Sequence, residues 1–151
     1  MLVPVADNPA SEQAMDVACR LAAEHQASIT AVTVIEIPPL LPLDAHMIEE
    51  EDEARRLLER AAAIGDSFGV GFSSRILRSR EAAGAIVDQA KATRPDIVVM
   101  GGARKSRRSA HAPIFGSTVQ VVLRKAPCRV MVVAASAENG AVAEQRQTVD
   151  S

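Results

Sequence analysis

The residues with the clearest capacity for chemistry lie between positions 97 and 118. An unbroken apolar run ends in Gly101-Gly102, and Gly116-Ser117-Thr118 follows after a basic segment. The paired glycines predict a turn with positive φ, where the backbone can come close to a ligand. The second motif is typical of a helix start, where unpaired N–H groups and the macrodipole favour an anion. Together the two motifs predict a phosphate-binding site.

The basic segment between the two motifs holds four cations in five residues, namely Arg104, Lys105, Arg107 and Arg108. Three roles stay open for these side chains: a lid over bound phosphate, a docking loop for an acidic partner, or solubility alone. The Gly116-Ser117-Thr118 motif also has a second interpretation, because the same residues could begin an ordinary helix that binds no ligand.

Alternating strand and helix patterns form the framework that must position these residues. Apolar, β-branched runs predict strands, and amphipathic runs between them predict helices. We expect strands at residues 2–6, 28–37, 72–79, 97–102 and 128–133, and helices at residues 9–25, 47–68, 81–93 and 116–124. This alternation predicts an α/β fold with an open five-stranded parallel sheet and helices on both faces, because right-handed crossovers leave few other arrangements.

Two short segments qualify this picture. Pro4 breaks a rule for central strands, because proline removes one hydrogen-bond donor from the ladder. The strand is kept because every later element requires it. Asp7, Asn8 and Pro9 then predict a helix cap with proline at the first helical position.

The segment from residue 38 to residue 53 combines a stiff connector with a charged helix start. Pro38, Pro39 and Pro42 interrupt the strand pattern and predict an exposed connector. The five acidic residues at positions 49–53 complement the macrodipole of the long helix that begins there. This acidic run is either a partner-docking face or a solvated helix start.

Composition argues against several classes of protein. A chain of 151 residues forms one domain with a substantial core. A net charge of −2 and an aromatic content of 2% argue against nucleic-acid binding. Cys19 and Cys128 form no CxxC pair, and His25, His46 and His111 lack metal-ligand spacing, so no metal site is expected. No apolar run reaches about 18 residues and no signal peptide is recognisable, so we expect a cytoplasmic protein without membrane insertion.

The segment from residue 97 to residue 133 resembles the closing part of the universal stress protein family. In that family the fourth strand ends in Gly-x-x-Gly, nine residues follow, and Gly-Ser/Thr begins the last helix. This chain departs from the pattern in two ways. The second glycine of the motif would fall near Arg104 or Lys105, where this chain has no glycine, and the loop is one or two residues longer. We expect the domain to cover residues 1–134, followed by a disordered tail at residues 135–151.

The resemblance implies strand order 3-2-1-4-5, with a ligand at the carboxyl ends of strands one and four, where the order switches. It implies an adenine nucleotide such as ATP, ADP or AMP, with Mg²⁺ as its companion. Ala6 takes the position of the family's ribose-binding aspartate, and Asp7 lies one residue later, where strand alternation turns it to the other face unless a bulge re-aims it. The candidate nucleotide-binding residues are Pro4, Ala6, Asp7, Val34, Met100, Gly101, Gly102, Arg104, Arg107, Gly116, Ser117 and Thr118.

We therefore expect a non-catalytic regulatory domain of the stress response that binds an adenine nucleotide. The alternative is a nucleotide-free interaction module with an unidentified protein partner, related to domains fused to membrane transporters. The sequence contains no GxSxG, HxGH or Walker A motif, so at most weak ATP hydrolysis is expected. A homodimer is expected through the edge formed by the last strand, at residues Val130, Met131, Val132 and Val133.

Overall fold

The computed structural model describes residues 1–103 and 115–135 of the chain. The strands are β1 (Leu2–Pro4), β2 (Ser28–Glu36), β3 (Gly71–Ser79), β4 (Ile97–Ala103) and β5 (Arg129–Ala135). The helices are α1 (Pro9–His25), α2 (Ile48–Phe68), α3 (Ala82–Thr93) and α4 (Ser117–Lys125). Every predicted element is present, with ends that differ from the expected ones by at most two residues. Ala135 ends β5 and does not begin the tail, and residues 136–151 lie outside the described ranges.

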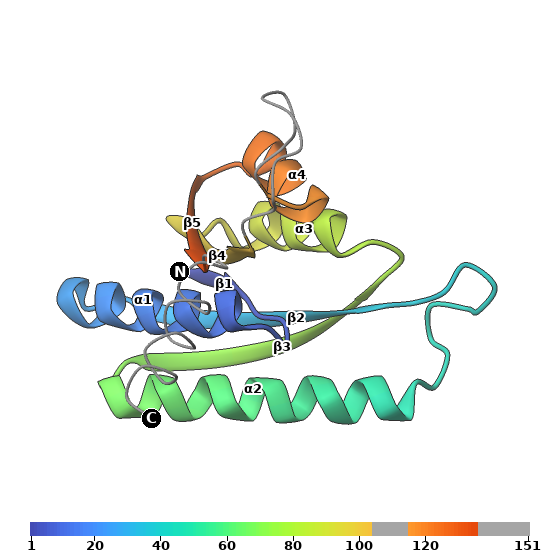
Figure 1. Ribbon diagram of the computed structural model, residues 1–151, viewed down its shortest axis with the longest axis horizontal. Coiled ribbons are helices and arrows are strands. Elements are labelled where there is room, and N and C mark those ends of the chain that lie inside the picture. The colour runs from blue at the N-terminus through green and yellow to red at the C-terminus, as the bar shows by residue number, and fades with distance from the viewer. Residues whose placement is uncertain (104–114, 136–151) are drawn as a thin grey trace, which may run out of the picture.

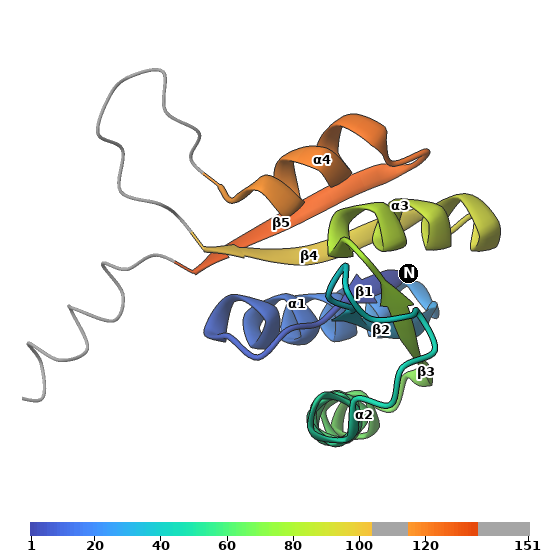
Figure 2. The ribbon, with the colours of Figure 1, turned by 90° about the vertical axis from the view of Figure 1, so that its right-hand side faces the viewer.

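All five strands are parallel and hydrogen-bond in the order β3-β2-β1-β4-β5, which confirms the predicted topology (Figure 1). Figure 2 shows the sheet between two helical layers, with α1 and α2 on one face and α3 and α4 on the other. The carboxyl ends of β1 and β4 therefore lie side by side at the point where the strand order switches.

The central strands are buried on both faces, which explains their unbroken apolar runs. Leu2 and Val98 pack into the core beneath α3 and α4. Their neighbours in sequence, Val3 and Val99, pack into the core beneath α1 and α2. Successive side chains point to opposite faces of a strand, so both cores draw on the same short segments.

The position of Pro4 explains why a proline is tolerated in this central strand. The N–H of Val5 donates to the carbonyl of Val32 on β2 at 2.8 Å. Strand alternation therefore directs the nitrogen of Pro4 toward β4. The register between β1 and β4 is limited to Leu2 and Val98, so the proline stands where that ladder has already ended.

Candidate functional site

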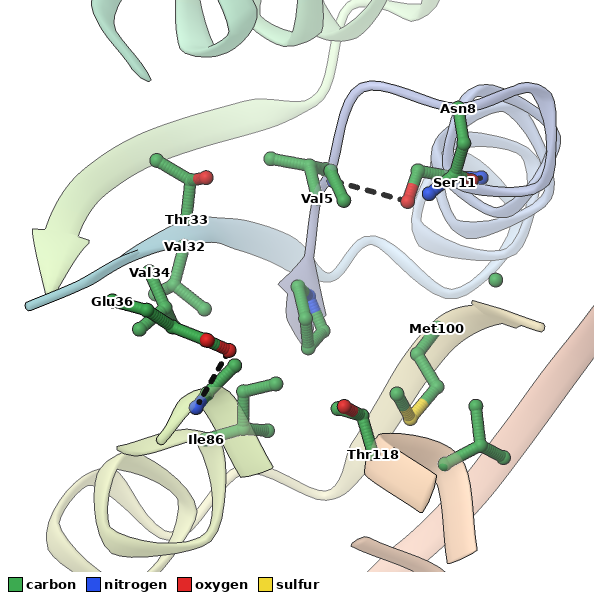
Figure 3. Close-up of a pocket in the computed structure, with 15 residues that line it drawn as sticks. Val5, Asn8, Ser11, Val32, Thr33, Val34, Glu36, Ile86, Met100 and Thr118 are labelled. Carbon is green, nitrogen blue, oxygen red and sulfur yellow. Dashed lines mark hydrogen bonds between the residues drawn. The ribbon is translucent and has the colours of Figure 1, made fainter. Parts of the chain in front are cut away.

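A cavity of about 420 Å³ opens at the carboxyl ends of β1 and β4, where the topology predicts a ligand (Figure 3). Its walls come from β1 and the turn after it, from β2, from the start of α3, from β4, and from the start of α4. The lining residues are Pro4, Val5, Ala6, Asn8, Ser11, Val32, Thr33, Val34, Glu36, Ala82, Ile86, Met100, Gly101, Thr118 and Val119.

The turn between β1 and α1 forms one wall of the cavity and is held by the helix cap. Asn8 is the N-cap, and its Oδ1 accepts the N–H of Ser11 at 2.9 Å, as the predicted cap requires. The hydroxyl of Ser11 in turn accepts the N–H of Ala6 at 3.0 Å, and Ser11 is only 6% exposed. These bonds fix the backbone of Ala6 against the cavity.

Asp7 does not face this cavity. Its Oδ1 lies 3.4 Å from Nη2 of Arg60 on α2, and its side chain is 87% exposed. Asp7 instead lines an adjoining cavity of about 410 Å³ between β2 and α2, which shares Ala6, Thr33, Val34 and Glu36 with the first. The one-residue slip predicted from the sequence therefore places Ala6 at the ligand cavity and Asp7 outside its lining.

Gly101 and Gly102 have a different role from the predicted turn. Both lie inside β4, and the one described glycine with positive φ is Gly69. A Cβ at Gly101 would stand 2.4 Å from the carbonyl carbon and oxygen of Ala10, so this glycine allows α1 to pack directly on the strand. A Cβ at Gly102 would stand 2.8 Å from the ring of Phe115. The prediction of a positive-φ turn was wrong, and the physical reason for both glycines is close packing.

The first turn of α4 supplies the opposite wall. Gly116 is the N-cap, with an extended backbone and no side-chain cap bond. The side chain of Thr118 lies at the cavity (Figure 3), whereas Gly116 and Ser117 are outside its lining. Because the first N–H groups of a helix lack intrahelical acceptors, this end of α4 can receive an anion beside Thr118.

Glu36 carries the one ionisable side chain in the described lining. Its Oε1 accepts the N–H of Ala82 at 3.3 Å, which joins the end of β2 to the start of α3. The remaining lining side chains are neutral, and most are apolar. Arg104 and Arg107 lie outside the described residues, in the segment that joins the end of β4 to α4.

Six of the twelve candidate residues thus line the cavity: Pro4, Ala6, Val34, Met100, Gly101 and Thr118. Sequence reasoning missed several residues that it could have found. Asn8 and Ser11 stand at the N-cap and third helical positions, a spacing at which a short polar side chain binds backbone N–H groups. Glu36 could not be found in this way, because its partner Ala82 is 46 residues away.

Three further observations concern the described residues only. No group of three or more His, Cys, Asp or Glu side chains there could hold a metal ion. His25 and His46 are exposed, and His111 lies outside the described ranges. None of the described helices has the length and apolar character needed to span a bilayer.

Comparison with known proteins gives consistent matches over this whole fold. A model of the universal stress protein family matches residues 1–134. A universal stress protein of Methanocaldococcus jannaschii is 26% identical over 139 residues, which covers 88% of this chain and 80% of the relative.

Solved structures show the same architecture. A universal stress protein from Archaeoglobus fulgidus in complex with dAMP has a TM-score of 0.68 and 21% identity, over 87% of this chain and 95% of that chain. A universal stress family protein from Arabidopsis thaliana with AMP bound has a TM-score of 0.62 and 20% identity, over 91% of this chain and 92% of that chain. At these identities the likeness establishes the fold.

Proposed function

The chain belongs to the universal stress protein family, and we propose that it is a regulatory domain that binds an adenine nucleotide between the ends of β1 and β4. The observation that carries this proposal is the cavity at the topological switch point, lined from the ends of several strands and helices. The likeness to folds solved with dAMP and with AMP supports the choice of ligand.

The size and the lining of the cavity support this proposal. Its volume of about 420 Å³ falls within the range of roughly 300–1,000 Å³ that is usual for small-molecule sites. Val32, Ile86 and Met100 offer apolar contacts for a base. The base would lie against the apolar residues, with the phosphates toward α4.

The phosphates would meet the N–H groups of the first turn of α4 and the hydroxyl of Thr118. Arg104 and Arg107 would add charge from the segment that precedes α4, and Mg²⁺ would accompany a triphosphate. Glu36 would repel phosphate, so the nucleotide would place its uncharged end toward β2.

We propose binding without turnover. A general base must stand within hydrogen-bond reach of the proton that it removes. The one ionisable side chain in the described lining, Glu36, already accepts a hydrogen bond from Ala82. The nucleotide would therefore act as a signal whose concentration sets the occupancy of the domain.

Calorimetry with AMP and ATP tests this proposal on the purified chain. Thr118→Phe places a ring in the cavity and should weaken binding about tenfold or more. Leu123→Phe is the matched control, because it puts the same ring on an exposed position of the same helix. Equal affinity in both variants would show that the nucleotide binds elsewhere. Native mass spectrometry of the protein as purified would identify any retained nucleotide.

A nucleotide-free interaction module is the second candidate, and one observation favours it. Ala6 presents a methyl group where the family resemblance implies an aspartate, and the carboxylate of Asp7 faces Arg60 on α2. An absence of binding at millimolar AMP and ATP would select this alternative.

We further propose a homodimer in which β5 pairs with β5 of a second copy. β5 is one edge of the described sheet, next to β4. Val130, Met131, Val132 and Val133 are all partly exposed along it. An apolar edge strand with free backbone groups favours pairing with another strand unless something covers it.

A further inference from the structure

The connector between β2 and α2 exposes an unusual amount of apolar surface. Leu40 is 97% exposed, Leu41 42%, Leu43 50% and Ile48 68%. These four residues, which we call the leucine loop, include all but one of the exposed large hydrophobic side chains in the described residues. Figure 1 shows the connector at one end of the molecule, beyond the ends of β2 and α2. Leu40, Leu41 and Leu43 are close together in the chain, and a cluster of exposed apolar side chains often marks an interaction site.

Two arginines near the end of β3 hold the loop in one shape. Nη1 of Arg80 donates to the carbonyl of Leu41 at 2.6 Å and to that of Pro38. Nε of Arg78 donates to the carbonyl of Leu43 at 2.9 Å, and its Nη2 donates to the carbonyl of Ala45. The guanidinium groups therefore bind the backbone of the connector and leave the leucine side chains free toward solvent.

Backbone hydrogen bonds and prolines within the connector also restrict its conformation. The N–H of Leu41 donates to the carbonyl of Pro38, and the N–H of Ala45 donates to that of Pro42, each at 3.0 Å. Proline fixes φ and narrows the set of loop conformations. A surface that is already ordered loses less conformational entropy when it binds. The leucine loop is thus an exposed but preorganised apolar surface.

The start of α2 adds negative charge beside this surface. Glu49, Glu50 and Glu53 are exposed, and Ile48 of the leucine loop is the first residue of the same helix. No salt bridge within the described residues involves these three carboxylates, whereas Glu51 pairs with Arg78 at 2.7 Å. The macrodipole favours acids at this helix end. These three carboxylates therefore follow the exposed apolar residues of the connector directly in the chain.

We propose that the leucine loop and the carboxylates of Glu49, Glu50 and Glu53 form a docking surface for a basic amphipathic segment of a partner protein. The partner's apolar side chains would cover the leucines, and its Lys or Arg side chains would meet the three carboxylates. Anionic lipid has the wrong charge for this surface. The surface follows β2 and begins α2. Because β2 lies next to the β3 edge of the sheet, the surface is distant in strand order from the β5 edge.

Fluorescence anisotropy with a labelled helical peptide of leucine and lysine tests the proposal on the full chain. A peptide of the same pattern with glutamate in place of lysine is the matched control and should not bind. The double variant Leu40→Ser, Leu41→Ser should weaken binding of the lysine peptide about tenfold or more. Leu123→Ser removes an exposed leucine elsewhere and should leave the affinity unchanged.

Charge and loop order are tested separately. The triple variant Glu49→Gln, Glu50→Gln, Glu53→Gln should weaken binding about threefold to tenfold and reduce its dependence on salt. Arg80→Met removes no proposed contact, but it should speed amide exchange in the loop and weaken binding at the same time.

Three results would overturn the proposal. The first is equal affinity for the lysine peptide in wild type and in the double leucine variant. The second is equal affinity of wild type for the lysine and glutamate peptides, which would indicate non-specific apolar contact. The third is leucine-dependent binding to phosphatidylcholine vesicles without binding to the lysine peptide, which would make the loop a membrane contact.

Discussion

Replacement of Gly101 by alanine tests how closely α1 lies on β4. The added Cβ would stand 2.4 Å from the carbonyl carbon and oxygen of Ala10 and 2.6 Å from the nitrogen of Ser11. All three are backbone atoms, so no side-chain rotation can relieve the contact. Ordinary contact begins at 3.4 Å, and the strand or the helix must therefore move by about 1 Å.

The expected loss of stability follows from this displacement. Extra methyl groups in a packed core destabilise a protein by about 1–3 kcal/mol, and a contact with rigid backbone belongs at the upper end. With a urea dependence of about 2 kcal/mol per molar, the unfolding midpoint of Gly101→Ala should fall by about 1.5 M. The same movement would displace Ser11, which holds Ala6 at the cavity, so AMP affinity should also fall.

Two other glycines provide matched controls for the same substitution. Gly84 lies in α3, and a Cβ added there would have no atom within 4 Å, so Gly84→Ala should raise stability by about 0.5–1 kcal/mol through helix propensity. A Cβ at Gly102 meets side-chain atoms of Phe115 and Val132 at 2.8 and 2.9 Å. These side chains can adjust in part, so Gly102→Ala should be less harmful than Gly101→Ala.

Urea unfolding followed by circular dichroism gives the order of stability directly. From the most to the least stable, the expected order is Gly84→Ala, wild type, Gly102→Ala and Gly101→Ala. A Gly101→Ala variant as stable as wild type would refute the close approach of α1 to β4. Normal stability with lost AMP binding would instead assign Gly101 to ligand contact, as its sequence motif first indicated.

Four other results are expected. Val132→Lys places a charge on the β5 edge and should convert the proposed dimer to monomers in light scattering, whereas a wild-type monomer at micromolar concentration would contradict that dimer. Removal of both Arg104 and Arg107 should weaken ATP binding about tenfold, and raised salt should weaken wild-type binding as well, both measured by calorimetry. Burial raises the pKa of the Cys19 thiol, so in a Cys128→Ser variant Cys19 should react with a disulfide reagent near pH 8 only after urea is added, and rapid reaction in that folded variant would contradict its burial. ATP turnover should stay far below about one per second, and a rate of that order in a coupled assay would reveal an active site.

The sequence predicted the elements of this fold because each one is specified locally. The run from Ile97 to Met100 is apolar and β-branched over a strand length, and it forms the buried part of β4. Asn8 and Pro9 mark the start of α1 at the expected residues. Alternating strands and helices then allow few topologies, and the family resemblance supplied the strand order from which a ligand is expected at the ends of β1 and β4.

The details of the site depend on contacts that no local pattern contains. Gly101 and Gly102 follow a buried strand, as glycines at a ligand turn would, but the backbone of α1 and the ring of Phe115 occupy the space beside them. Whether these glycines serve a ligand turn or close packing depends on the distance between β4 and α1, a helix that begins some ninety residues earlier in the chain. A single sequence cannot give that distance, because the packing of two distant elements determines it.

The partners of two arginines at the end of β3 and just after it also could not be predicted from the sequence. Arg75 and Arg78 lie in β3, which is one edge of the described sheet. The partners of Arg78 and Arg80 on the connector, however, are 35 and 39 residues away, at Leu43 and Leu41. Each arginine binds a backbone carbonyl, which every residue type possesses. The type of the partner residue therefore gives no sequence signal from which the contact could be predicted. A charged residue near a strand end can thus organise a distant loop even where the sequence pattern indicates only exposure.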